Sequence, residues 1–224
     1  MPSLSNVAAQ NLQRLIADGT YAPGVALPSQ RDLAETLGIS RTSLREAISM
    51  LEALGFVRSH AGKGVFVTAG KGRDAGDIPA NPLGMRPEAI FQFRFVLEPA
   101  AASMVAANPQ NNSSELQEIQ SNLEAALHSM DLVTAAECDM TFHHCIARLS
   151  GNEAFASVLK QYETQVAYSL QLPFANPQGI WDTADEHLAV INAINQHDPA
   201  TARQAMQTHL LRAASRVGIH FYQP

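Results

Sequence analysis

The first 55 residues repeat one local pattern, in which apolar side chains recur at helical spacing and a glycine ends each run. The first run covers residues 6–19, with its Val, Leu and Ile side chains on roughly one side. Ser29 and Ser40 precede the next two runs, and a serine hydroxyl at that position accepts a free N–H of the first helical turn. Gly38 and Gly55 end those runs. The pattern predicts three short helices.

Two short segments of β-branched and aromatic residues follow the third predicted helix. FVRSH, residues 56–60, and GVFVT, residues 64–68, flank a glycine-rich turn, which favours a hairpin. The next run, residues 68–84, is rich in Gly, Pro, Asp and Asn and has no apolar period, as is typical of a linker. We therefore predict a front domain at residues 1–70 and a linker at residues 71–85.

Behind the linker, every apolar repeat has helical spacing. Asp131 and Asp198 stand where helix N-caps belong, and Pro199 suits a first helical position. The predicted helices lie near residues 87–107, 113–129, 132–149, 153–171, 180–196 and 199–218. The predicted fold class is mainly α, with three helices and a β-hairpin joined by the linker to an all-α antiparallel helical bundle at residues 86–220.

Charge divides the chain at the same linker. The 224 residues carry a net charge of −6. Residues 1–73 hold eight Lys/Arg and five Asp/Glu, a balance of +3, whereas residues 74–224 hold seven and sixteen, a balance of −9. A basic front and an acidic rear indicate two domains with different partners.

The sequence carries no sign of export or of membrane insertion. No stretch approaches the roughly 18 uninterrupted apolar residues of a membrane span. Cys138 and Cys145 would lie about 10 Å apart along one predicted helix, which is beyond disulfide reach. We expect a soluble, cytoplasmic protein.

The third predicted helix has two chemically different faces. At about 100° per residue, Leu44 and Leu51 share a broad apolar face, while Arg41, Thr42 and Arg45 gather on the other side, mainly in the first turn and a half. A helix that enters the major groove of DNA contacts bases and phosphates chiefly through such N-terminal residues, and Arg can bind guanine through two hydrogen bonds. This face is a candidate for DNA recognition.

The two arginines alone are also compatible with an ordinary solvated helix face. In that interpretation Arg41 and Arg45 would pair with a neighbour such as Glu46 or Glu52. The order of helix, helix, tight turn, helix and hairpin favours DNA binding over this alternative.

Residues 27–67, LPSQRDLAETLGISRTSLREAISMLEALGFVRSHAGKGVFV, resemble the winged helix-turn-helix of GntR-type bacterial transcription regulators. Gln30 stands where that family usually has Glu, and Ser43 where Pro is common; neither change removes a group that reads DNA. The resemblance implies DNA contacts at Arg31, Ser40, Arg41, Thr42, Arg45 and Gly62, with Lys63 as a phosphate contact.

The segment DMTFHH, residues 139–144, places polar chemistry on the apolar side of a predicted helix. Asp139 and His143 are four residues apart and therefore adjacent on one face, which continues through Ile146. An ionised aspartate on a buried face is costly unless it is paired or bound to a cation. His144 points about 100° away, so the first histidine of the pair is the candidate partner of Asp139.

Two later helices also turn a histidine inward. His187 lines up with Ile191, and His209 with Met206. Each histidine taken alone is compatible with an ordinary core residue. Three inward histidines and an inward aspartate together favour a metal site, and imidazole and carboxylate ligands suit Zn, Ni, Mn or Fe better than Ca or Mg.

The rear half is similar to the FCD effector-binding domain, which accompanies this winged helix in the FadR subgroup. The resemblance rests on RFVLEPAAASMVA, DMTFHHCIARLSGN, DEHLAVINAINQHD and ARQAMQTHL. By motif it assigns the metal ligands of one divalent ion, Zn foremost, to Asp139, His143, His187 and His209. It implies that the ion holds the carboxylate of a small organic acid, and that this acid changes how a homodimer presents its winged helices to a near-palindromic operator in double-stranded DNA.

Arg94 stands four residues before Glu98 within the RFVLE segment. It could bind an oxygen of the acid, or it could form an ion pair with Glu98 along the helix.

Two other functions are compatible with the same residues. The metal itself could be the signal to which a regulator responds. A metalloenzyme with an accessory DNA-binding domain is the third possibility, because an open metal site can activate water. Glu137 and Glu186 flank the ligands, but their helix positions are predicted to aim them elsewhere, so a general base is missing and we predict that the protein is not an enzyme.

Overall fold

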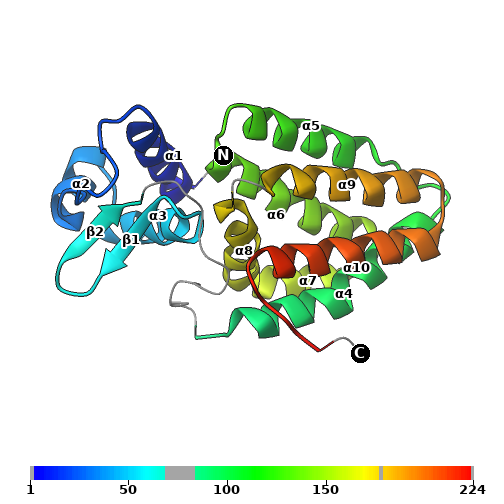
Figure 1. Ribbon diagram of the computed structural model, residues 1–224. Helices are drawn as coiled ribbons and strands as arrows, with labels where there is room; N and C mark the ends of the chain where they lie inside the picture. Colours follow the sequence, from blue (N-terminus) through cyan, green and yellow to red (C-terminus); the bar gives the residue numbers. More distant parts are fainter. Residues whose placement is uncertain (1–2, 69–83, 177–178, 223–224) are drawn as a thin grey trace.

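The computed structural model describes residues 3–68, 84–176 and 179–222 (Figure 1). Most of the predicted linker, residues 71–85, lies outside the described residues. The predicted fold class is confirmed: three helices and a two-stranded hairpin precede a second group of helices. The predicted domain boundaries stay a prediction.

The front domain consists of α1 (Leu4–Ala17), α2 (Gln30–Leu37), α3 (Arg41–Ala53), β1 (Val57–His60) and β2 (Gly64–Val67). The predicted serine caps are present, since the Ser29 hydroxyl accepts the N–H of Asp32 at 3.2 Å and the Ser40 hydroxyl accepts that of Ser43 at 3.0 Å. Gly38 ends α2 in the left-handed region, with φ 65°. The strands pair antiparallel, with His60 opposite Gly64 at the turn.

The rear domain contains seven α-helices and one 3-10 helix among the described residues. Their bounds are α4 (Pro87–Ala107), α5 (Ser114–His128), α6 (Leu132–Leu149), α7 (Glu153–Gln161), α8 (Glu163–Gln171), η1 (Leu172–Ala175), α9 (Ile180–Asn195) and α10 (Pro199–Arg216). The prediction of a single helix at residues 153–171 is wrong, because the segment forms α7 and α8. Between them Tyr162 leaves the helical conformation, at φ −101° and ψ 20°, and packs its ring against Phe93.

The long helices α4, α6, α9 and α10 surround a shared core (Figure 1). Its buried members include Phe95 on α4, Phe142 on α6, Ile191 on α9 and Met206 on α10. Within the described residues, α4 alone is long and apolar enough to cross a membrane by length and composition, but 56% of that window is buried inside the protein. Its apolar character is therefore accounted for by the core.

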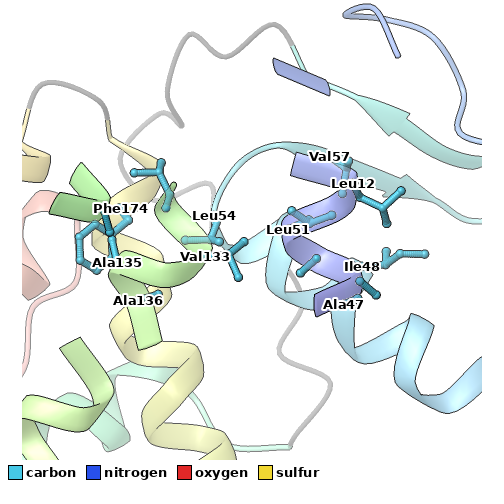
Figure 2. Close-up of a cluster of buried hydrophobic side chains, with 14 of the residues drawn as sticks. Leu12, Ala47, Ile48, Leu51, Leu54, Val57, Val133, Ala135, Ala136 and Phe174 are labelled. Carbon is cyan, nitrogen blue, oxygen red and sulfur yellow. The ribbon is translucent and has the colours of Figure 1, made fainter. Parts of the chain in front are cut away.

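The two domains share a hydrophobic interface (Figure 2). Leu12 of α1 and Leu54 after α3 belong to the same buried cluster as Val133 of α6 and Phe174 of η1. At the end of α3, Gly55 has φ 79°, and a Cβ on it would lie only 3.2 Å from the Ala175 Cβ. A larger residue at this position would therefore strain both the turn and the contact.

Polar side chains of α1 complete this interface. The Gln13 amide accepts the N–H of Val133 at 3.0 Å and donates to the carbonyl of Met130 at 3.0 Å. Gln10 donates to the Thr134 hydroxyl at 2.8 Å. The winged helix is therefore attached to the first turn of α6.

Candidate metal centre and DNA-binding surface

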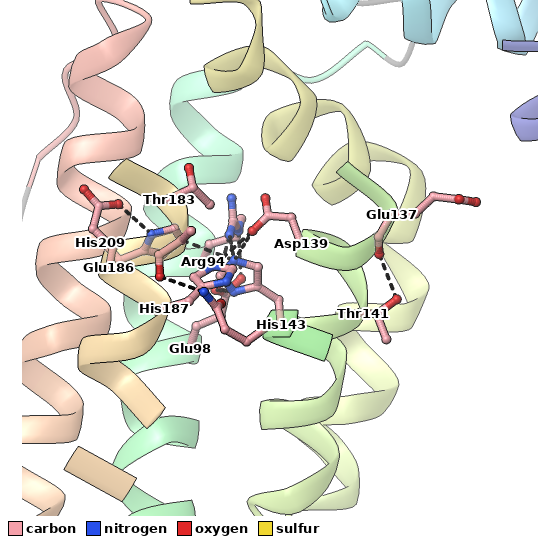
Figure 3. A network of polar contacts seen from close by, with 12 residues as sticks. Arg94, Glu98, Glu137, Asp139, Thr141, His143, Thr183, Glu186, His187 and His209 are labelled. Carbon is pink, nitrogen blue, oxygen red and sulfur yellow. Dashed lines mark hydrogen bonds and ion pairs between the residues drawn. The ribbon is translucent and has the colours of Figure 1, made fainter. Parts of the chain in front are cut away.

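Four predicted ligands meet in the interior of the helical domain (Figure 3). Asp139 and His143 come from α6, His187 from α9 and His209 from α10. One donor atom from each lies within 4.8 Å of the other three, and all four residues are buried. Residues distant in sequence thus form one compact cluster.

The donor atoms converge on a carboxylate oxygen. Asp139 Oδ1 lies 3.1 Å from His187 Nε2 and 3.5 Å from His143 Nε2, and His209 Nε2 lies 3.3 Å from His143 Nε2. Asp139 Oδ1 and His187 Nε2 are buried without an aligned hydrogen-bond partner. Three imidazole nitrogens and one carboxylate oxygen are ligands that suit a divalent transition-metal ion, above all zinc.

The protonation states of Asp139, His187 and His209 favour metal binding at neutral pH. Burial would raise the pKa of Asp139, but the close imidazoles of His143 and His187 outweigh it and lower the pKa below the usual range. Burial lowers the pKa of His187 to about 4 and lowers that of His209 as well. An ionised carboxylate and neutral imidazoles are the forms that bind a cation.

The pKa of His143 shifts in the opposite direction to those of His187 and His209. Burial would lower its pKa, but the nearby Glu98 carboxylate raises it overall. Glu98 Oε2 lies 2.7 Å from His143 Nδ1, although this nitrogen has no aligned hydrogen bond. At this distance the two groups form an ion pair whenever His143 is protonated.

Arg94 borders the same cluster. Its side chain is completely buried and donates to Glu98 Oε1 at 2.7 Å and to the Ser169 hydroxyl at 3.2 Å. The ion pair considered for Arg94 and Glu98 is thus present. The same guanidinium also reaches His143, with Nη2 3.1 Å from Nε2, so Arg94 adjoins the donor atoms as well.

The prediction that Glu186 aims away from the ligands is wrong, because Glu186 Oε2 accepts a hydrogen bond from His209 Nδ1 at 2.9 Å. Arg216 binds the same carboxylate at 2.9 and 3.1 Å. On its own helix Glu186 does not share the face of His187, but the neighbouring helix α10 brings His209 to it. Glu137 does aim elsewhere, toward the side chain of Asn6 on α1.

The predicted DNA-contacting residues lie together on the front domain. The first five are exposed on α2 and at the start of α3, and the other two are exposed at the hairpin turn; in chain order they are Arg31, Ser40, Arg41, Thr42, Arg45, Gly62 and Lys63. Arg31 pairs with Glu35 at 3.2 Å, and 79% of its side chain is exposed. Within the residues that the structure describes, Arg41 and Arg45 form no ion pair, and Glu52 instead binds Ser59.

Comparison with protein-family models identifies both domains. Residues 4–67 match the model described as bacterial regulatory proteins, gntR family, and residues 89–212 match the FCD domain model. The chain is also 31% identical over 218 residues to the putative L-lactate dehydrogenase operon regulatory protein of Escherichia coli K12, covering 92% of this chain and 83% of that one. The chain belongs to the gntR family.

Other relatives of this GntR-family regulator are also transcription regulators. The Exu regulon transcriptional regulator of Escherichia coli K12 is 28% identical over 211 residues, covering 90% of this chain and 80% of the relative. The Glc operon transcriptional activator of the same strain is 26% identical over 219 residues, covering 92% of this chain and 86% of the relative. The prediction of a DNA-binding regulator and not an enzyme is confirmed.

Solved structures share the fold of the GntR-family chain. A transcriptional regulator GntR from Rhodococcus sp. RHA1, described there as putative, has a TM-score of 0.56 at 21% identity and covers 98% of this chain and 100% of its own. Escherichia coli McbR/YncC has a TM-score of 0.54 at 20% identity, and the match covers 97% of this chain and 98% of that one. Both share the fold of this chain over nearly its whole length.

Proposed function

We propose that this GntR-family regulator is controlled by a small organic acid that binds at a metal centre in the FCD domain. The centre would hold one divalent transition-metal ion, with zinc as the first candidate and nickel, manganese or iron as others. Asp139, His143, His187 and His209 are the proposed ligands. The observation that carries the proposal is the convergence of their buried donor atoms within 4.8 Å.

The chemistry of the donor set explains why an acid would bind there. A bound divalent ion supplies a Lewis-acid contact for a carboxylate oxygen. Arg94 would supply a second contact, since its Nη2 already lies 3.1 Å from His143 Nε2 and so borders the donor atoms. Arginine suits this role because its planar guanidinium binds carboxylates through paired hydrogen bonds.

The names of relatives indicate which acids to test first. One relative is described as a putative regulator of an L-lactate dehydrogenase operon, and L-lactate is a small 2-hydroxy acid. We propose 2-hydroxy acids as the first class, followed by sugar acids, amino acids and dicarboxylates.

The site is connected to the DNA-binding domain through α6. This helix carries Asp139 and His143 in its middle and contacts α1 in its first turn, where Gln13 binds Val133 and Met130. A displacement of α6 on acid binding would therefore move the surface on which the winged helix rests.

We propose that DNA binding uses a homodimer on a near-palindromic operator, in the cytoplasm. The front domain would contact DNA through Arg31, Ser40, Arg41, Thr42, Arg45, Gly62 and Lys63. The exposed positions of Arg41 and Arg45 near the start of α3 support this assignment, because the N-terminal part of a recognition helix approaches the base edges.

A thermal-shift screen of organic acids on zinc-loaded protein tests the proposal. A specific acid should raise the melting temperature by mass action and should change the affinity for DNA from the gene's own promoter region. Asp139→Ala should lose both responses, while His144→Ala should keep them. The proposal fails if the protein binds no such DNA at low salt, with or without metal and acid.

A metal-responsive regulator is the second candidate. Four protein ligands are enough to complete a tetrahedral zinc site without an acid, and this structure offers four. Titrating operator binding separately with zinc and with acid distinguishes the two. A metal sensor would respond to zinc over its physiological range, whereas an acid sensor would retain zinc throughout and respond to the acid.

A further inference from the structure

A carboxylate and a guanidinium stand directly behind His209. Glu186 Oε2 lies 2.9 Å from His209 Nδ1, and Arg216 binds both oxygens of that carboxylate. Arg216 also donates to the Thr183 hydroxyl at 3.2 Å. Glu186 and Thr183 lie on α9, whereas His209 and Arg216 lie on α10. The contacts therefore join two helices that each carry a proposed metal ligand.

This arrangement determines which nitrogen of His209 carries the proton. Arg216 donates to both oxygens of Glu186, at 2.9 and 3.1 Å, and a carboxylate that accepts paired hydrogen bonds from a guanidinium is ionised. An ionised carboxylate can only accept hydrogen bonds, and His209 Nδ1 must therefore be the donor. The lone pair of a neutral His209 is then on Nε2, the atom that lies 3.3 Å from His143 Nε2 in the cluster.

The other two histidines are held differently. His187 stacks on Phe142 with ring centroids 3.7 Å apart and 10° between planes, and its Nδ1 has no hydrogen-bond partner among the described residues. His143 has Glu98 at 2.7 Å from Nδ1, but without hydrogen-bond alignment. Of the three, His209 alone has an aligned hydrogen bond from Nδ1 to a carboxylate.

We propose that Glu186 and Arg216 are positioning residues for the metal centre, which hold His209 as the Nδ1–H tautomer with Nε2 directed at the ion. This inference rests on the metal site of the proposed function. Arg216 contributes by fixing both oxygens of Glu186, so that the carboxylate cannot rotate away from the imidazole. Groups of this kind behind a metal-bound histidine orient the ring and increase its basicity.

Glu186→Gln tests the role while retaining the shape of the side chain. The variant should bind zinc about 10- to 100-fold more weakly in a competition titration with a chromophoric chelator. Asp185→Asn is the matched control, because Asp185 is the neighbouring acid on α9 and is exposed; its zinc affinity should stay within twofold of wild type.

Nitrogen-15 NMR of histidine-labelled protein supplies a measurement that a merely structural role would not change. In the wild type, the His209 signals should show a proton on Nδ1 both before and after zinc is added. A proton on Nε2 in the zinc-free wild type would overturn the inference. If Glu186→Gln does not fold because Arg216 loses its partner, Glu186→Gln with Arg216→Met removes both charges together and should show the same weakening.

The outcomes separate this inference from the proposed function. A wild type that binds no zinc would overturn the metal site and this role with it. If the wild type binds zinc and both Glu186 variants bind it with the same affinity as the wild type, the positioning role alone is overturned.

Discussion

Gln13 on α1 accepts a hydrogen bond at 3.0 Å from the backbone N–H of Val133 in the first turn of α6. Both residues are buried, and the same helix α6 carries two of the proposed metal ligands two to three turns further on. The winged helix and the candidate effector site thus share one rigid element.

Gln13→Ala should uncouple the two domains. The ratio of operator affinities with and without the active acid should fall toward one, as measured by fluorescence anisotropy, because the Gln13 side chain loses its hydrogen bonds to Val133 and Met130. Leaving the Val133 N–H unpaired should also cost about 1 to 3 kcal/mol of stability. Zinc affinity should remain at the wild-type value, and a parallel loss of zinc would show that the residue supports the site itself and not the coupling.

His143→Ala should abolish zinc retention, whereas His144→Ala should leave it nearly intact. The reason is that His143 Nε2 lies among the donor atoms, while His144 is half-buried and is not one of the four clustered residues. Metal content after dialysis, measured by atomic emission, checks this. The reverse result would show that the assignment of the two helix faces is wrong.

Arg45→Ala should weaken operator binding by about 1 to 3 kcal/mol if the arginine reads a base, and the dependence on salt should change little. If Arg45 contacts a phosphate, the loss of affinity should be similar on all DNA sequences. The slope of log affinity against log salt concentration should then fall in magnitude by about one. Arg203→Ala is the control, since Arg203 is exposed on α10 in the other domain. Equal binding by both variants would remove Arg45 from the DNA contacts.

Acid should destabilise the zinc-free protein through Glu98. Burial would raise the pKa of this carboxyl, but Arg94 and His143 outweigh it and lower the pKa to about 2. A depressed pKa in the folded state means that the unfolded chain binds more protons, so this contribution is complete above pH 4.5 and is lost between pH 4.5 and 2.

Denaturant unfolding across that pH range measures the loss. Arg94→Met with Glu98→Gln removes both charges and should show a shallower decrease in the free energy of unfolding than wild type. An identical slope in the two proteins would mean that other carboxyl groups account for the acid sensitivity.

Interactions between neighbours along the chain were enough to predict most of the helices and the pairing of Asp139 with His143 in the candidate metal site. A serine before a helical repeat can cap it through local hydrogen bonds, so Ser40 and the glycine turn after α2 correctly indicated where α3 begins. Asp139 and His143 could be paired from spacing because residues four apart share a face of any α-helix. His187 and His209 could be placed inward for the same reason, from their apolar neighbours.

The contacts between helices were decided only by the tertiary structure. Whether Glu186 meets His209, 23 residues away, depends on how α9 and α10 are rotated and spaced, and no periodicity within either helix contains that information. The break at Tyr162 likewise accompanies packing against Phe93 on α4. The sequence by itself therefore determined most of the helices, their buried faces and the types of the candidate ligands, because these follow from neighbours along the chain. Only the packed structure decided which buried charges contact those residues, because that depends on side chains from different helices meeting in one small volume.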